Sequence, residues 1–381
     1  MVTQTPTPQT RLNQRALSLD ALKGVIMIVM ALDHVRSFFL QYDGVKEIWY
    51  EPAIYNPAPW DFWARYVSHP AAPGFFFLMG MGIVLLAQSR AKVGWDANFI
   101  SRNLAIRGFI LIALQFIAED VAWMLRSGDP WRLVSTGVLS TLGASMMVSS
   151  ILWRLKPWMV AAISAACLLG SSFLILSLGM ENGNFSLLER LLVVAGEFGP
   201  VKVNYPLIPW IGVTGLGMVY GWYWLSDQRR GYSTSLFIGL ALVLLFIGMR
   251  LAENGLWNLR PQIDDSFWAF MQATKYPPAL SWLSLQLGIC LILIWLFWKS
   301  EIMIERALTI LLIFGRSPLF FYVAHLFLYA SLSMFVFNEH TTIASSAAFW
   351  WVVGLLLLWP LCKWYGDFKG RQKPGSVWRY F

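Results

Sequence analysis

Long apolar stretches alternate with short polar segments along most of this chain. A window of about 19 residues, the length that crosses the hydrocarbon core of a membrane as a helix, detects ten such stretches. We expect transmembrane helices near residues 20–41, 65–88, 104–125, 133–153, 157–179, 205–226, 234–253, 278–298, 307–336 and 344–364. The pattern therefore predicts an all-α, polytopic membrane bundle of about ten to eleven helices.

The ninth stretch differs from the others because Gly315, Arg316, Ser317 and Pro318 interrupt it. Proline has no backbone N–H to donate, and it disfavours helical geometry in the residue before it. We therefore expect a break or a kink at this position.

Composition agrees with a membrane protein and adds an orientation. Hydrophobic residues make up 57% of the chain and charged residues only 13%, whereas an average soluble domain has roughly 25% charged residues. If the N-terminus is cytoplasmic, the cytoplasmic segments hold 17 lysines and arginines and the opposite side holds 9. Because cytoplasmic loops carry the excess of these residues, both termini are expected in the cytoplasm.

We interpret residues 1–381 as one transmembrane domain, with a polar N-terminal segment over 1–17 and a basic cytoplasmic tail over 366–381. The formal charge of +8 belongs to membrane loops in this interpretation, so nucleic acid is not an expected partner. The three cysteines and four histidines show no metal-ligand spacing, and no metal site is expected. The lipid bilayer is an expected partner, and a homo-oligomer is possible.

The first apolar stretch carries more ionisable residues than a membrane span usually does. Asp20, Lys23, Asp33, His34 and Arg36 all lie between residues 18 and 40. Each costs on the order of 3 kcal/mol inside a membrane, so such residues usually face the protein interior or a wet cavity. This stretch is the first candidate for a functional site.

Helical geometry places Lys23 and His34 on one face. Their spacing of 11 positions leaves about 20° between them around the axis and about 16 Å along it. A cytoplasmic donor with phosphate groups could bind at Lys23, while its reactive end extends past Met27 and Met30 to His34. A neutral imidazole can accept a proton from an attacking group and return it to a leaving group. The alternative is a structural histidine that hydrogen-bonds across the bundle.

The remaining candidates are less specific. Asp33 points about 100° away from His34, and we expect it to pair with Arg36 or with a neighbouring helix. His69, at the start of the second span, is either a site residue or a hydrogen-bonding residue of the helix start. His325 is expected to have a polar role within the bundle, and His340 to be solvated in an outer loop.

Three long segments on the expected outer side, residues 41–64, 179–204 and 254–277, are rich in aromatic residues, proline and glycine. Such loops could pack over the outer mouth of the bundle and shape an acceptor site. Alternatively, their aromatic residues form only the usual belt at the membrane interface.

Five stretches distributed from the first span to the ninth resemble a known family. The chain is similar to the bacterial membrane family that carries the heparan-α-glucosaminide N-acetyltransferase catalytic domain. The matching stretches are RALSLDALKGVIMIVMALDHVR, YVSHPAAPGFFFLMG, YPLIPWIGVTGLGMVYG, KYPPALSWLSLQLG and FGRSPLFFYVAHLFLY. The spacing from Lys23 to His34 also resembles the basic-x10-histidine motif of the acyltransferase-3 family, whose members acylate sugars.

The resemblance implies an enzyme that transfers an acyl group, typically acetyl from cytoplasmic acetyl-CoA, to a sugar amine or hydroxyl on the far side of the membrane. It implies an envelope glycan or another sugar as acceptor and the bacterial inner membrane as location. In this hypothesis His34 is the general base or, alternatively, a covalent acyl carrier, and Asp33 and His69 position the acceptor or tune His34. The donor phosphates are assigned to four basic residues: Lys23, Arg102, Arg107 and Arg316.

The match departs from the family pattern at one point. The lysosomal branch of the family has a catalytic histidine before a tryptophan in the loop after the first span, whereas the corresponding stretch here, NPAPWDFW, has none. His34 falls where that branch has an asparagine, and His69 roughly where it has an aspartate.

Two other classes of function stay open. A secondary transporter or exporter would use Asp33, His34 and Arg36 as a proton relay. It should show two similar halves with paired broken helices, and only the ninth stretch is visibly broken. A non-catalytic scaffold would give no reason for the charges of the first span.

Overall fold

The fold is that of a computed structural model. It describes residues 17–39, 47–50, 59–127, 134–179, 184–336 and 344–373, together with residues 376 and 378.

Helices make up most of the described chain, and three short strands and one π-helical turn complete it. In chain order the elements are α2 Leu17–Phe39, α3 Pro59–Ser68, α4 Ala71–Lys92, α5 Ala97–Leu114, the π-helical turn η1 Gln115–Glu119, α6 Asp120–Ser127, β1 Val134–Thr136, α7 Val138–Leu152, α8 Pro157–Leu178, α9 Leu187–Leu192, β2 Gly196–Phe198, β3 Val201–Val203, α10 Leu207–Ser226, α11 Gln228–Leu251, α12 Gly255–Asn258, α13 Phe267–Met271, α14 Leu280–Lys299, α15 Glu301–Arg306, α16 Thr309–Arg316, α17 Pro318–Val336 and α18 Ala344–Arg371.

Each of the ten predicted apolar stretches contains a helix of the structure. Seven helical segments of the described chain are long and apolar enough to cross a membrane, which makes this an integral membrane protein. The other three stretches are those of α2, α7 and α10. Of these, α2 carries several charges and α7 has only 15 residues. The number of helices that actually cross the bilayer stays a prediction, as does the side on which each terminus lies.

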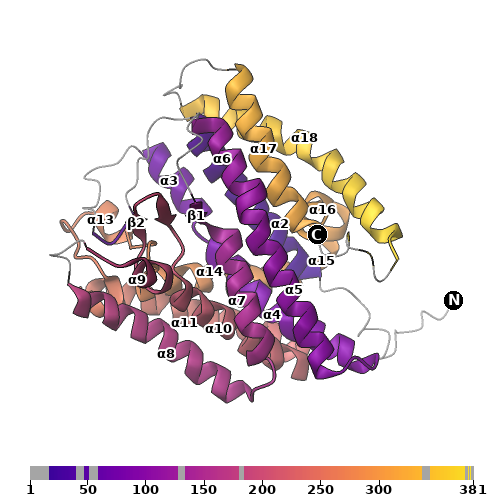
Figure 1. Ribbon diagram of the computed structural model, residues 1–381, viewed down its shortest axis with the longest axis horizontal. Coiled ribbons are helices and arrows are strands. Elements are labelled where there is room, and N and C mark those ends of the chain that lie inside the picture. The colour runs from indigo at the N-terminus through magenta and orange to yellow at the C-terminus, as the bar shows by residue number, and fades with distance from the viewer. Residues whose placement is uncertain are drawn as a thin grey trace.

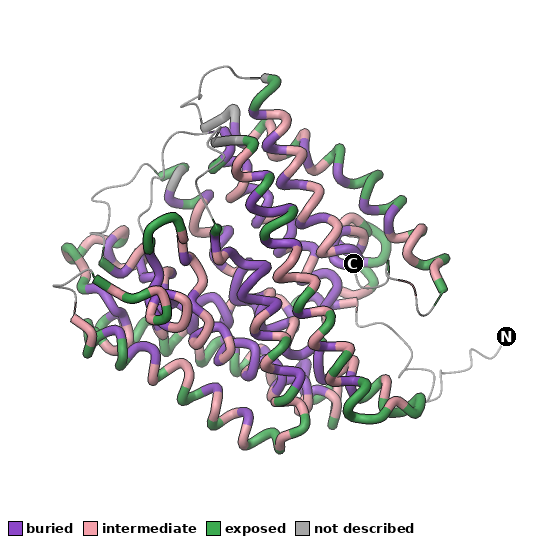
Figure 2. Tube along the Cα trace, viewed as in Figure 1, coloured by how far each residue is buried: buried purple, intermediate pink, exposed green. Residues whose placement is uncertain are grey.

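The bundle is organised around α2, which packs against α3, α4, α14, α16, α17 and α18. In Figure 1, α8 lies along one edge of the bundle, and α18 lies along the opposite edge beside α17. The outer helices expose apolar side chains, such as Phe173 on α8, Leu244 on α11 and Leu356 on α18. Figure 2 shows this exposure on the periphery and burial in the inner helices, as expected for a bundle surrounded by hydrocarbon.

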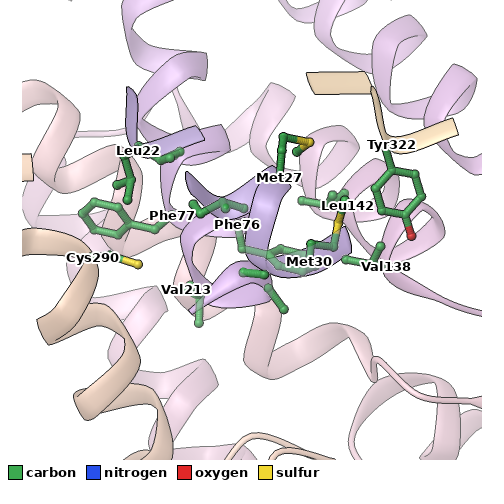
Figure 3. Close-up of a cluster of buried hydrophobic side chains, with 14 of the residues drawn as sticks. Leu22, Met27, Met30, Phe76, Phe77, Val138, Leu142, Val213, Cys290 and Tyr322 are labelled. Carbon is green, nitrogen blue, oxygen red and sulfur yellow. The ribbon is translucent and has the colours of Figure 1, made fainter. Parts of the chain in front are cut away.

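The side chains between Lys23 and His34 belong to the hydrophobic core. Met27 and Met30 are buried, and Figure 3 shows them with Phe76 of α4 and with Val138 and Leu142 of α7. The face that Lys23 and His34 share is therefore tightly packed between its two ends. Methionine is unbranched and flexible, so this packing can rearrange more easily than a stripe of branched residues.

The described parts of the three long loops meet at one end of the bundle. Ile48 pairs with Tyr276 in an isolated β-bridge, and the ring of Trp49 lies 5.8 Å from that of Phe185. The loop end also contains a three-stranded sheet in the order β1-β3-β2, a departure from the predicted all-α class. Loop backbone that is covered by neighbouring loops needs internal hydrogen-bond partners, and the short strands supply them.

The predicted break at Pro318 is a complete reversal of the chain rather than a kink in one long span. Along α16, Leu311 contacts Gly24 and Gly315 contacts Asp20, so α16 runs antiparallel to α2. The chain then begins α17 beside Asp20 and reaches His34 at His325, so α17 runs parallel to α2. The stretch predicted as residues 307–336 is therefore one short helix and one span.

Close backbone contact between α2 and α16 requires glycine at position 315. A β-carbon at Gly315 would lie only 1.8 Å from the carbonyl oxygen of Asp20. Gly315→Ala should therefore separate the two helices and lower the stability by roughly 1–3 kcal/mol, visible as a lower melting temperature in detergent. Gly82→Ala on α4 is the matched control, because a β-carbon there meets nothing within 4 Å. Equal melting temperatures for the two variants would contradict the tight α2–α16 contact.

Candidate functional site

Two histidines form a pair inside the bundle. His34 of α2 and His325 of α17 approach with 2.6 Å between Nδ1 of His34 and Nε2 of His325. Their rings are nearly parallel, with centroids 4.9 Å apart and 14° between the planes. His325 is fully buried. His34 thus faces the protein interior rather than lipid, and the predicted polar role of His325 is a direct contact with the candidate base.

The surroundings of the pair determine where its protons lie. Nδ1 of His325 is 2.9 Å from the carbonyl oxygen of Phe321, which can only accept, so this nitrogen carries a proton. In a neutral His325, Nε2 is then an acceptor, and Nδ1 of His34 must donate to it. A neutral His34 consequently keeps the lone pair of Nε2, and no donor among the described residues occupies it. This is the arrangement that a general base requires.

Aromatic and acidic side chains enclose the pair. Trp123 of α6 meets the His34 ring edge-on at 5.7 Å between centroids, and Tyr322 does so at 6.2 Å. The Tyr322 hydroxyl donates to Oε2 of Glu119 at 2.8 Å. Glu119 ends the π-helical turn η1, and such turns occur frequently at functional sites.

Asp33 belongs to a second network, which the sequence predicted only as an ion pair with Arg36 or with a neighbouring helix. Both contacts exist: Arg36 Nη1 lies 3.7 Å from Asp33 Oδ1, and Arg65 of α3 donates to the other carboxylate oxygen. Arg65 also binds Glu47 through two hydrogen bonds of 3.1 and 2.6 Å. Burial would raise the pKa of the Glu47 carboxyl, but Arg65 and His69 outweigh it and hold that pKa well below its usual value.

His69 lies at the junction of α3 and α4 and is bound through both ring nitrogens. Nε2 contacts the Glu47 carboxylate, and Nδ1 lies 3.4 Å from the indole nitrogen of Trp282. Because an indole N–H can only donate, Nδ1 is the acceptor and Nε2 carries the proton that Glu47 accepts. The neutral ring therefore has no lone pair left for a substrate, in contrast to His34.

Sequence reasoning did not single out the buried acids at the junction of η1 and α6. Asp120 accepts from Ser135 Oγ at 2.5 Å and from Gln115 Nε2 at 3.0 Å, while Gln115 Oε1 accepts from the Ser140 backbone N–H. The available signal was the pair Glu119-Asp120 at the end of a predicted span, where acidic residues are costly. Tyr322 carried no such signal, because nothing in its neighbours along the chain predicts the contact with Glu119.

At the other end of α2, two of the four predicted donor-binding residues come together. Lys23 Nζ is 2.8 Å from Asp20 Oδ1, and Arg316 Nε is 3.7 Å from Asp20 Oδ2. Both cations are accessible, with 30% of the Lys23 side chain and 42% of the Arg316 side chain exposed. Arg102 and Arg107 lie instead on α5, which packs mainly against α7.

Two further sequence predictions concern His340 and metal binding. His340 lies outside the described residues. Within the part of the chain that the structure describes, no group of three or more histidine, cysteine, aspartate or glutamate side chains is arranged to hold a metal ion.

Comparison with known families agrees with the resemblance seen in the sequence. The model of the heparan-alpha-glucosaminide N-acetyltransferase catalytic family matches residues 15–252. The chain belongs to this family. No curated protein matches the chain.

Family membership makes this an integral membrane protein of a transferase family, with acetyl transfer as the family's chemistry. The matched region contains α2, α3 and η1, and therefore His34, Arg65 and Glu119. His325 and Arg316 lie beyond it. The second histidine of the pair therefore comes from a part of the chain that the family match does not cover.

The Glu47 contacts predict how stability depends on pH. Glu47→Gln removes one of the two carboxylates beside Arg65 and should cost about 3 kcal/mol at pH 7. Because the folded-state pKa of Glu47 is depressed, its contribution is complete above about pH 4.5 and is lost as the pH falls toward the folded-state value. Melting temperatures in detergent should thus differ clearly at pH 7 and converge below pH 4.5. A constant difference across this range would contradict the ionised state of Glu47. Glu253→Gln, at an exposed glutamate after α11, is the control.

Proposed function

We propose that this protein is a membrane-embedded acyltransferase that moves an acetyl group from acetyl-CoA to an amine or hydroxyl of a sugar. The observation that carries the proposal is the unoccupied Nε2 lone pair of His34, whose tautomer is set by His325 inside the bundle. Membership of an acetyltransferase family supports the reaction class.

The proposed reaction needs one base and no covalent intermediate. Nε2 of His34 accepts a proton from the attacking amine or hydroxyl as the new bond to the acetyl carbon forms. The bond between that carbon and the CoA sulfur then breaks, and the imidazolium returns the proton to the leaving thiolate. The products are the acetylated acceptor and CoA with a free thiol. Asp33 and His69 do not exchange protons in this scheme; they hold α2, α3 and α4 in place around the acceptor.

The donor is proposed to bind from the end of α2 that carries Lys23. Lys23 and Arg316 are exposed there, and their charges are shared by a single carboxylate, Asp20. This leaves a net positive site for donor phosphates. Arg102 and Arg107 of α5 are proposed as further phosphate contacts. The acetyl group would then reach His34 as Met27 and Met30 move aside, with the donor side cytoplasmic and the acceptor an envelope glycan at the loop end.

The direct test is acetyl transfer by the purified protein in detergent. Acetyl-CoA is supplied with a panel of amino sugars and hydroxyl sugars, and both the free thiol and the acetylated sugar are measured. Release of thiol in step with acetylation of one class of sugar supports the proposal. If the protein neither binds CoA nor acetylates any acceptor in the panel, the proposal is overturned.

A secondary transporter is the second candidate, and one observation favours it. The chain is broken and reversed between α16 and α17, and transporters commonly use discontinuous helices at their binding sites. Transport requires a sealed membrane, whereas acetyl transfer does not. Proton-coupled uptake into proteoliposomes without thioester cleavage would therefore favour the transporter.

Replacement of His34 tests the assignment of the base. His34→Gln should lower acetyl transfer by about 10²–10⁴-fold, because no general base then faces the acceptor. The melting temperature should change little. Ser37→Ala, at an exposed residue one turn further along α2, should retain wild-type activity. A stable His34→Gln protein with full activity would defeat the assignment.

His325 is proposed as a positioning residue that acts only through His34. His325→Phe removes the acceptor for Nδ1 of His34 and allows the other tautomer, so kcat should fall at least about tenfold. The KM for acetyl-CoA should stay unchanged, since His325 contacts no donor in this scheme. Ser333→Ala, which loses only a hydrogen bond within α17, is the control. A rise in KM with unchanged kcat would show that His325 binds the donor instead.

A further inference from the structure

Gln286, in the middle of α14, is a buried amide without a partner. Its relative exposure is 0%, and neither its amide nitrogen nor its amide oxygen has a hydrogen-bond partner among the described residues. An unpaired buried polar group typically costs about 1–3 kcal/mol. Such a group calls for an explanation, and a partner supplied by a ligand is one.

The neighbours of Gln286 on α14 show how deep in the bundle this amide lies. Trp282 and Cys290 lie one helical turn before and after Gln286, so all three occupy one face of the helix. Trp282 contacts His69, at the level of the Asp33 network. On the other side of Gln286, Cys290 lies at the level of Ile26 of α2. A β-carbon on Gly74 would lie 3.2 Å from Cys290 Sγ and 2.5 Å from Ile26 Cδ1. The amide therefore lies at an intermediate depth, between the level of Ile26 and that of His69.

That depth is also intermediate between Lys23 and His34. Ile26 lies one turn beyond Lys23 on α2, and Met30 lies one turn further, just before His34. Since α14 packs against both α2 and α4, Gln286 lies at the depth of the middle of the proposed donor route. The α2 residues between Lys23 and Asp33 are all apolar, so Gln286 is a polar group at the depth of an apolar stretch.

We infer that Gln286 binds an amide of the pantetheine arm when CoA is present, an inference that rests on the proposed function. The arm carries secondary amides, each with one N–H donor and one carbonyl acceptor. The side chain of glutamine offers the complementary acceptor and donor at one position. The nucleotide end binds at Lys23 and Arg316, and the arm extends past Gln286 with the thioester at His34. No bond is made or broken at Gln286.

The test separates the arm from the nucleotide. The affinities of wild type and Gln286→Met for CoA and for adenosine 3′,5′-bisphosphate, which lacks the arm, are measured by calorimetry in detergent. Gln286→Met should lower the affinity for CoA by about tenfold and leave the affinity for the bisphosphate unchanged. Ser281→Ala on the same helix is the control. It removes a buried hydroxyl that also has no partner among the described residues, and it should change neither affinity.

Three outcomes would overturn the inference. Unchanged CoA affinity, with a melting temperature equal to or above that of wild type, would mean that Gln286 holds only a buried water. An equal loss of affinity for both ligands would mean that the substitution disturbs the whole site. Wild-type protein that binds neither ligand would refute the donor assignment itself and is distinguishable from the first two. Gln286→Asn, which keeps an amide, provides a second variant and should retain part of the CoA affinity.

Discussion

The placement of Arg65 between two carboxylates is the interaction on which the loop end of this structure depends. Asp33 comes from α2 and Glu47 from the segment before α3, so one guanidinium of α3 links both of them. Charges in a low-dielectric interior are tolerated only when they are paired and hydrogen-bonded. The bidentate contact with Glu47 and the contact with Asp33 meet this condition. The network continues through His69 to Trp282, so it also connects α14.

The two histidines of the proposed site are in opposite hydrogen-bonding situations. His69 lies between a carboxylate and an indole, and both of its ring nitrogens are bound. His34 has one nitrogen directed at His325 and the other without a donor in the described structure. A ring bound on both sides stabilises the fold, whereas a ring fixed on one side and open on the other can accept a proton. These contacts, rather than position along the chain, distinguish a base from a structural residue.

The two ends of α2 are correspondingly different. At one end, the chain reversal between α16 and α17 brings Arg316 to Asp20 and leaves two cations exposed. At the other, segments of three loops and a small sheet cover the bundle. Between them lies a packed core of methionines and aromatic residues, next to the unpaired amide of Gln286. An acyl group transferred between these ends would move along α2, which packs against the elements that carry Arg65, Gln286, Arg316 and His325.

Much of this protein was determined locally, by its sequence. Apolar runs of membrane length predicted where helices form, because hydrogen bonding within a helix is the way for a single segment to satisfy its backbone in hydrocarbon. Pro318 predicted the break, since the loss of an N–H donor acts on adjacent residues. The fixed rise and rotation of a helix placed Lys23 and His34 on one face, and the ionisable residues of α2 marked it as the candidate site.

Contacts between residues distant along the chain were decided only by the tertiary structure. His34 and His325 are 291 positions apart, and Tyr322 and Glu119 are 203 apart. No periodicity within one segment encodes such pairs, because each depends on how whole helices pack. The same holds for the reversal at Pro318: a proline predicts that a helix ends, but the antiparallel course of α16 follows from its glycine contacts with α2, and the parallel course of α17 follows from the contact of His325 with His34. The tautomer of His34, on which its proposed role as a base depends, is likewise a property of the assembled bundle.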